Sequence, residues 1–203
     1  MARPRQSSDE DILRAAFRAI ARLGPARLTL ADVADEAGLS AAAVVHRFGS
    51  KKDLLLAAAA DAATGADYIF PGLRARHRSP VAALEGLADC MAAFGATPES
   101  LANNLSFWQA DLTDAGFHRH ALAASRGMRA GIRALVRDAI AAGELVRCDA
   151  GQLAGSLQAT LNGSMVNWAV HRKGSLAAWL RRDLRGVLTP YRSRRGGRIM
   201  RRS

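Results

Sequence analysis

The spacing of apolar residues along the chain predicts helices from its beginning onward. After Ser8, apolar positions recur every three or four residues up to Leu23, which is typical of an amphipathic helix of about four turns. A short second helix is expected to begin after Thr29, a typical N-cap residue, and to end at Gly38. Residues 41–48 then form a third helix of barely two turns.

The rest of the chain also follows a helical spacing, and no alternating pattern predicts a strand. Residues 70–80, "FPGLRARHRSP", are expected to form a loop. Pro80 and Pro98 suit helix starts, and Gly143 suits a helix stop. Gly174 is expected to separate the last two helices. The predicted fold class is therefore all-α.

Two short helices joined by a tight turn at Gly38 form a helix-turn-helix, which places its second helix in the major groove of DNA. Small side chains at the start of that helix allow close approach to base edges. The expected reading surface consists of Ala41, Ala42 and Ala43. The expected phosphate contacts come from His46, Arg47 and Lys51. An ordinary helical protein with short alanine-rich helices is the alternative.

Composition supports a folded protein, because 49% of the 203 residues are hydrophobic and 23% are charged. The net charge of +11 is concentrated at the end of the chain, where "RSRRGGRIMRRS" holds six arginines in twelve residues. These residues, 192–203, are expected to be a disordered basic tail. The sequence shows no signal peptide and no apolar run of membrane-spanning length, which predicts a cytoplasmic protein. Cys90 and Cys148 stand too far apart in sequence to indicate a zinc site or a disulfide framework.

The segments "ILRAAFRAIARLG" and "LTLADVADEAGLSAAAVVHRFGSKKDLLLAA" resemble the tetracycline-repressor (TetR) family of bacterial transcription regulators. The resemblance is close over residues 11–58 and looser to the end of "SLAAWLRRDLRGVLTPY". It implies a helix-turn-helix DNA-binding domain over residues 1–52. It further implies a helical domain for effector binding and dimerisation over residues 53–191, followed by the basic tail.

The resemblance also assigns DNA contacts by position. Backbone contacts fall on Thr29, Ser40, His46, Arg47 and Lys51, and base contacts on Ala41, Ala42, Ala43 and Val45. Where the family usually has Lys-Gly-Thr and two tyrosines, this chain has the three alanines, Val45 and Arg47. Alanine methyl groups contact thymine methyl groups but make no bidentate hydrogen bonds to guanine or adenine. Specificity is then expected to depend on DNA shape, backbone N–H groups, or Arg3 and Arg5 in a minor groove; a solvated terminus is the alternative for these two arginines.

An effector cavity between the middle helices is implied by the same resemblance, with a largely apolar lining and few polar groups. Its candidate residues are Met91, Phe94, Asn104, Leu105, Trp108, Met128, Asn162 and Met165. Each of them also fits an ordinary place in the hydrophobic core. The expected effector is a largely apolar small molecule that weakens DNA binding, and no cofactor is expected.

Apolar stripes on the last two predicted helices exceed what one thin domain covers, and the resemblance implies that these helices form a four-helix bundle with a second copy. The candidate interface residues are Leu153, Leu157, Leu161, Trp168, Leu176, Trp179, Leu180, Leu184, Val187 and Leu188. Burial within one chain is the alternative explanation for part of each stripe. A second stripe, on the long helix before them, consists of Arg126, Arg129, Arg133 and Arg137. It fits either a solvated helix face or a second DNA surface.

The sequence gives no support to catalysis, since it lacks the glycine-rich loops and nucleophile motifs of common enzymes. His118 and His120 lie near Asp111 and Asp114, but two histidines at this spacing point to different sides of a helix, so no metal site is expected. Three functions remain: a dimeric, effector-responsive regulator, usually a repressor, that binds a near-palindromic operator; a sequence-tolerant DNA-coating protein; and a helical ligand-binding protein without an operator.

Overall fold

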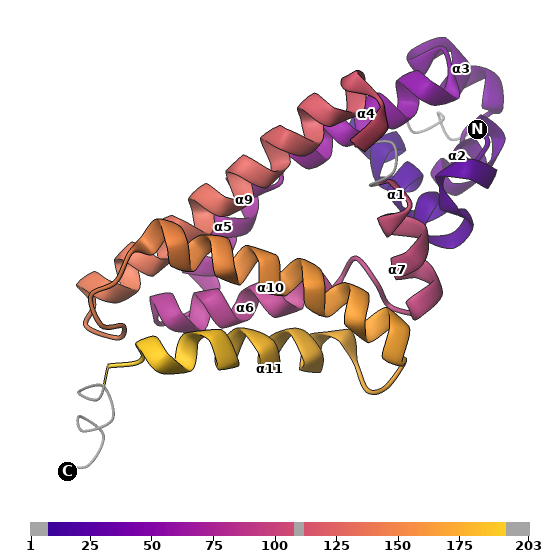
Figure 1. The fold of residues 1–203 in the computed structure, drawn as a ribbon. Helices are drawn as coiled ribbons and strands as arrows, with labels where there is room; N and C mark the ends of the chain where they lie inside the picture. The colour runs from indigo at the N-terminus through magenta and orange to yellow at the C-terminus, as the bar shows by residue number, and fades with distance from the viewer. Residues whose placement is uncertain (1–7, 108–111, 194–203) are drawn as a thin grey trace. The chain divides into compact units, whose positions relative to one another are not determined.

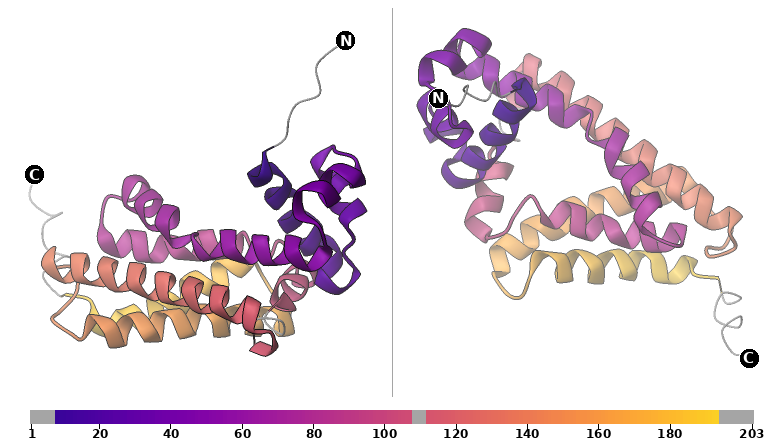
Figure 2. Two further views of the ribbon diagram at one scale, coloured as in Figure 1. Left: turned by 90° about the horizontal axis from the view of Figure 1, so that it is seen from above. Right: turned by 180° about the vertical axis from the view of Figure 1, so that it is seen from behind.

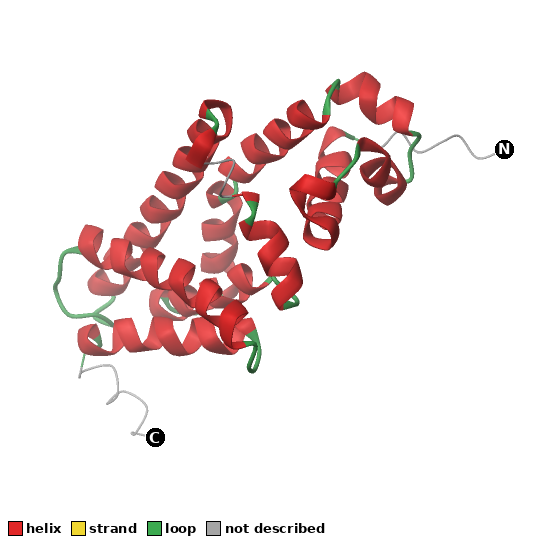
Figure 3. Cartoon of the chain, turned by 45° about the vertical axis from the view of Figure 1, so that its right-hand side comes forward, coloured by secondary structure: helices red, strands yellow, loops and turns green. Residues whose placement is uncertain are grey.

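The computed structural model describes residues 8–107 and 112–193 (Figure 1). Its helices are α1 (Asp9–Arg27), α2 (Leu30–Ala37), α3 (Ala41–Phe48), α4 (Lys51–Ala63), α5 (Ala66–Arg76), α6 (Pro80–Ala92), α7 (Pro98–Leu105), α9 (Ala115–Ala141), α10 (Ala150–His171) and α11 (Leu176–Leu188), and a 3-10 turn, η1, spans Thr189–Tyr191. The all-α class is confirmed over these ranges, where helices are joined by loops (Figure 3) and the β pairing consists of one isolated bridge between Leu145 and Arg192. No helix in the described ranges is both long and apolar enough to cross a membrane.

Most helix ends lie where the sequence predicts them. The Ser8 hydroxyl accepts the backbone N–H of Asp11, whose carboxylate in turn accepts the Ser8 N–H, so α1 begins with a complete capping box. Helices α6 and α7 begin at Pro80 and Pro98 as predicted. Gly143 follows α9 with a φ of 70°, a left-handed conformation that glycine adopts without steric cost.

The loop predicted over residues 70–80 is wrong over most of its length, because α5 continues to Arg76. Phe70 and Leu73 on this helix are 3% and 1% exposed. A Cβ on Gly131 of α9 would lie only 2.0 Å from the Phe70 ring. The ring therefore occupies the space that the missing side chain leaves, and this burial outweighs the helix-breaking tendency of Pro71.

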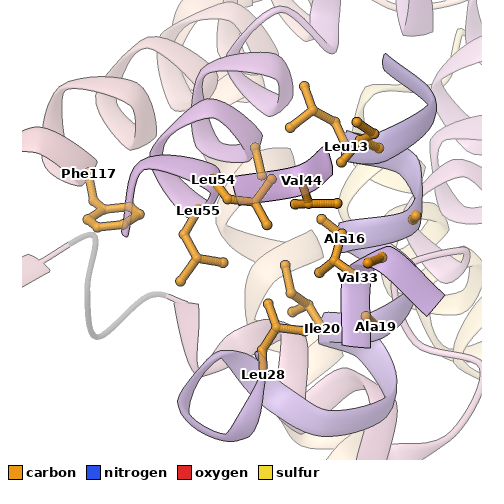
Figure 4. Close-up of a cluster of buried hydrophobic side chains, with 14 residues drawn as sticks. Leu13, Ala16, Ala19, Ile20, Leu28, Val33, Val44, Leu54, Leu55 and Phe117 are labelled. Carbon is orange, nitrogen blue, oxygen red and sulfur yellow. The ribbon is translucent and has the colours of Figure 1, made fainter. Parts of the chain in front are cut away.

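The chain folds into two compact units, whose boundaries differ from the predicted domains. Unit 1 comprises residues 1–63 and 99–123, and unit 2 comprises residues 64–98 and 124–203. The core of unit 1 gathers Ile12 and Ile20 from α1, Val33 from α2, Val44 from α3 and Leu54 from α4, each at most 1% exposed (Figure 4). Helix α3 is therefore held in place by contacts with several other helices.

Unit 1 also depends on residues that lie far along the chain. Gly24 interrupts α1 with a φ of 75°, and a Cβ there would lie 2.9 Å from Oδ1 of Asn103 on α7. The Asn103 side chain donates through Nδ2 to the carbonyl of Ala21 at 3.0 Å. Phe117 of α9 is 5% exposed within the same core. Two segments separated by more than thirty residues thus complete one fold.

In unit 2, α11 packs against both α6 and α10, and the three helices lie side by side in Figure 1. Figure 2 shows the same group from two other sides. Most of the predicted dimer-interface residues are buried in this packing, at 0–4% exposure: Leu153, Leu157, Leu161, Trp168, Leu176, Leu180, Leu184 and Leu188. Helices of the same chain cover these eight side chains, and their assignment to a dimer interface stays a prediction. Trp179 and Val187 are partly exposed. Burial within one chain, the alternative considered from the sequence, agrees with the low exposure of the other eight.

Candidate nucleic-acid interface

Helices α2 and α3 are joined by the short turn that a helix-turn-helix requires. Gly38 ends α2 in a left-handed conformation with a φ of 68°. The backbone N–H of Leu39 donates to the Ala34 carbonyl at 2.8 Å, which closes the turn as glycine-ended helices commonly do. The Ser40 hydroxyl then accepts the N–H of Ala43 at 3.2 Å and begins α3. Hydrogen bonds between residues close in sequence therefore set where α2 ends and where α3 begins.

Helix α3 has a buried side and an exposed side. Val44 is fully buried, and Phe48, one turn later, packs against the core of unit 1. Ala41 and Ala42 are exposed, Ala43 is half-buried, and Val45 is 45% exposed. The exposed side is thus a row of small apolar groups, suited to contact with base edges and thymine methyl groups.

Thr29 is expected to contact the DNA backbone, but its donors already have a partner in this structure. Its N–H and hydroxyl donate to the Asp32 carboxylate at 2.8 and 2.6 Å, which completes the capping box of α2. These hydrogen bonds lower the pKa of Asp32, so the acid stays ionised at neutral pH. In Ser40, by contrast, the hydroxyl oxygen acts as a cap acceptor, which leaves its hydrogen available for a phosphate oxygen.

The basic residues predicted to hold phosphates have different surroundings. His46 and Arg47 are exposed at the end of α3. Arg47 Nη1 lies 3.5 Å from Oδ1 of Asp9 on α1, in an exposed pair of the kind that contributes little stability and separates readily. The pairing of Asp9 with Arg47 could not be predicted from the sequence, because 38 positions separate the two residues and no motif links them.

Lys51 and Lys52, at the start of α4, both bind groups within unit 1. Lys51 Nζ donates to the carbonyl of Ala26 at 2.8 Å and so ties α4 to the end of α1. Lys52 Nζ lies 2.7 Å from Oδ2 of Asp114, and this hydrogen bond raises the pKa of Lys52 and lowers that of Asp114. To contact a phosphate, the Lys51 ammonium group would have to release the Ala26 carbonyl or donate to both groups at once.

The predicted effector residues are divided between the units. Met91, Phe94, Met128, Asn162 and Met165 belong to unit 2, whereas Asn104 and Leu105 belong to unit 1, and Trp108 lies outside the described residues. Met165 is 3% exposed and Phe94 is 48% exposed, so they do not share one environment. Two hollows described within unit 2 are lined by other residues, one between α10 and α11 and one between α9 and α10.

The described residues contain no group of three His, Cys, Asp or Glu side chains placed to hold a metal ion. Asp114, one of the acids near the histidine pair, binds Lys52 and the N–H of Gly116. Asp111 lies outside the described residues.

Two protein-family models match the chain. The model described as bacterial regulatory proteins of the tetR family matches residues 12–58, which contain the helix-turn-helix. The model described as the C-terminal part of BetI-type transcriptional repressors matches residues 81–189, more than half of the chain. A search of curated proteins finds no match.

Solved structures agree with the fold. A TetR transcription regulator from Haloarcula marismortui has a TM-score of 0.75 at 22% identity, over 91% of this chain and 98% of its own. A TetR-family regulator from Agrobacterium tumefaciens has a TM-score of 0.71 at 23% identity, over 91% and 97%. SmeT, the repressor of the Stenotrophomonas maltophilia efflux pump SmeDEF, has a TM-score of 0.65 at 22% identity, over 93% and 92%. The matched helix-turn-helix, the matched C-terminal half and this shared fold place the chain in the TetR family of DNA-binding transcription regulators, which are not enzymes.

Proposed function

We propose that this regulator is a repressor that binds a near-palindromic operator as a dimer and releases it when a largely apolar small molecule binds. The observation that carries this proposal is the exposed face of α3, which consists of small side chains. Val44, on the buried side, anchors the helix to the core of unit 1. That face can approach base edges closely. The matched C-terminal model is named for repressors, and SmeT is a repressor, which favours repression over activation. The proposed place of action is the cytoplasm, where bacterial DNA lies.

Footprinting on the DNA upstream of its own gene tests operator binding. The expected result is a protected, near-palindromic site, bound at least roughly 10³-fold more tightly than bulk DNA. Equal binding to all duplexes would instead support the sequence-tolerant DNA-coating function. Absence of DNA binding at moderate salt would favour a ligand-binding protein without an operator.

Dimerisation is proposed to use the outward face of α10 and α11, since the inward face is buried. Val166 and Val170 on α10 are 41% and 73% exposed. Beside them, a hollow between the helices is lined by Gly163, Asn167, Gly186 and Val187, among others. A Cβ on Gly163 or Gly186 would meet no atom within 4 Å, so another helix can approach closely there. A twofold dimer would present two copies of α3 to the two halves of an operator.

Replacing Gly163 with Arg is expected to separate the dimer and leave the fold of each chain intact, because the space above Gly163 is empty within one chain. Light scattering should show the mass fall from twice the chain mass of 21.6 kDa to that mass. Ala130→Arg, at an exposed position on α9, is the control and should remain dimeric. A Gly163→Arg protein that remains dimeric would exclude this face.

The effector is proposed to be largely apolar because its candidate residues include Met91, Met128 and Met165, with few charged side chains. Binding is expected to weaken operator affinity by about 5- to 150-fold, which corresponds to a coupling of about 1–3 kcal/mol. Calorimetry with candidate compounds, followed by anisotropy of labelled operator, measures both quantities. A highly charged tightest ligand would contradict the assignment, and unchanged operator affinity of the loaded protein would contradict release.

A further inference from the structure

The first turn of α1 places a carboxylate beside an arginine of α3. Nη1 of Arg47, in the last turn of α3, lies 3.5 Å from Oδ1 of Asp9, the first residue of α1. Both residues belong to unit 1, so the pair lies within one compact part of the chain. Arg47 is expected to contact a DNA phosphate, and in this structure its guanidinium group already has an anion of the protein beside it.

Helical spacing explains why these two residues approach each other. Leu13 lies one turn after Asp9 on α1, and Val44 lies one turn before Arg47 on α3. Leu13 and Val44 are 9% and 0% exposed in the same hydrophobic core, where Figure 4 labels both. Burial of these two apolar side chains fixes the sides of α1 and α3 that carry Asp9 and Arg47. The position of the pair therefore follows from the core as well as from the attraction between its charges.

The two side chains of the pair differ in exposure. Arg47 is exposed as a whole residue, but its side chain is 28% exposed, whereas the Asp9 side chain is 72% exposed. The arginine side chain thus lies along the protein surface. An exposed ion pair of this kind gains little free energy, so a phosphate oxygen can replace the carboxylate. Charge-assisted hydrogen bonds between guanidinium and phosphate favour that exchange.

The other two acids in the first turn of α1 have different partners. Asp11 accepts hydrogen bonds from Nη2 of Arg14 at 2.7 Å and from the N–H of Ser8 at 3.0 Å, and these bonds lower its pKa to about 2. Glu10 lies 3.8 Å from Nη1 of Arg14. Asp9 is thus the acid of this turn that pairs with α3, and Glu10, next to it in sequence, offers a matched comparison.

Lys51, the other residue of this region expected to contact phosphate that has a partner on α1, is held by a neutral group. Its Nζ donates to the carbonyl of Ala26 at 2.8 Å. When Lys51 leaves that carbonyl, no net negative charge remains near the DNA. When Arg47 leaves Asp9, a full negative charge remains close to the phosphate that Arg47 contacts. Asp9 therefore opposes DNA binding twice, by holding Arg47 beforehand and by repelling the phosphate afterwards.

We propose that Asp9 sets the affinity of this regulator for DNA by competing with phosphate for Arg47. The proposal rests on the proposed contact of α3 with DNA, and it concerns how tightly the protein binds, not which sequence it selects. In the free protein Asp9 holds the guanidinium group, and in the complex a phosphate oxygen takes its place. Because every DNA sequence offers the same phosphates, the competition lowers the affinity for operator and bulk DNA by the same factor. An acid at this position thus reduces the general attraction to DNA of a chain whose net charge is +11.

Two other roles for Asp9 predict different results. If the carboxylate oriented Arg47 toward the phosphate, its removal would weaken DNA binding. If the pair served only to hold α1 near α3, its removal would lower stability and leave DNA affinity unchanged. The geometry favours competition, because 3.5 Å is well beyond the roughly 2.7–2.9 Å at which a carboxylate fixes a guanidinium group.

The test measures the affinity of full-length Asp9→Asn protein for a duplex of random sequence, by fluorescence anisotropy at low salt. Removal of the competing carboxylate should raise the affinity by roughly 2- to 5-fold, the range expected for an exposed ion pair. The gain should shrink as salt is added, because exposed charges are screened. Glu10→Gln removes the same charge one residue away and should raise the affinity less. Asp9→Glu keeps the charge and should keep the affinity of the parent protein.

A second measurement assigns the gain to Arg47. In an Arg47→Ala background, Asp9→Asn should change the affinity by less than about 1.5-fold, because no guanidinium group is left to release. An equal gain in both backgrounds would mean that Asp9 acts only by general repulsion, which overturns the proposal. Unchanged or weaker DNA binding by Asp9→Asn alone overturns it as well.

The ratio of operator to random-duplex affinity should stay unchanged in Asp9→Asn, which separates this test from footprinting of the operator. A protein with a protected operator site and no gain from Asp9→Asn would refute the competition alone. A parent protein that binds no DNA would refute both the competition and the proposed function. Thermal unfolding should show Asp9→Asn close to the parent in stability, since the pair is exposed.

Discussion

The Ala42→Glu variant is expected to bind its operator no more tightly than a scrambled duplex, a loss of roughly 10³-fold or more in preference. Ala42 is exposed in the first turn of α3, on the side that faces away from the core of unit 1. A glutamate there would place a carboxylate against base edges and phosphates, where it has no favourable partner. An acid in the first turn of a helix is also compatible with the helix dipole, so folding should not suffer.

Two further variants separate recognition of the operator sequence from general electrostatic attraction to DNA. Ala62→Glu adds the same charge at an exposed position on α4 and should keep the operator preference. Arg47→Ala should weaken binding to operator and scrambled duplexes alike, because Arg47 is expected to contact a phosphate. The slope of log K against log salt should fall in magnitude by about one. Salt-titrated fluorescence anisotropy measures all three variants. Normal operator binding by Ala42→Glu would mean that α3 is not the recognition helix.

The second large effect is expected on stability, from Gly131→Ala. The new Cβ would lie 2.0 Å from Cε2 of Phe70, whose side chain is enclosed between α5 and α9. Overpacking of this kind costs about 1–3 kcal/mol, and the gain in helix propensity, at most about 1 kcal/mol, offsets only part of it. We expect a net loss of about 1–2 kcal/mol, and a Tm lower by roughly 2–8 °C.

Gly155→Ala is the matched control, since it makes the same substitution within a helix where the nearest side-chain atoms, those of Arg129, are 3.7 Å away. It should be neutral or should stabilise the protein by about 0.5–1 kcal/mol. Thermal unfolding followed by circular dichroism compares the two variants with the parent. If Gly131→Ala unfolds at the same temperature as Gly155→Ala, Phe70 does not depend on this glycine for its position.

The elements that depend on local sequence are predicted well. Ser8, Thr29 and Ser40 begin helices as their side chains predict, and Gly38 ends one, because capping hydrogen bonds join residues only a few positions apart. The helical part of residues 70–80 is missed because Pro71 argues against a helix locally, whereas the burial of Phe70 on Gly131 depends on a helix far along the chain.

The site is predicted less completely than the fold. Exposure of Ala42 follows from the helical period once Val44 is placed in the core, because residues two positions apart point to opposite sides of a helix. Exposure of Ala41, three positions before Val44, does not follow from it. The hydrogen bond from Lys51 to Ala26 and the approach of Asp9 to Arg47 could not be predicted, since the pairs are 25 and 38 positions apart. Likewise, period alone shows that Leu157 and Leu184 face an apolar neighbour, but not whether that neighbour is another helix of the same chain or a second copy.

The hydrogen bond between Asn103 and Ala21 limits how this regulator can be recombined with others. A chimera cut after residue 63 would carry α1 to α4 without the side chain that holds the end of α1 and without Phe117 in the core. Exchange of DNA specificity by grafting therefore has to transfer residues 99–123 together with the first 63, or else replace only the exposed residues of α3. The smallest exchangeable part of this protein is discontinuous in sequence.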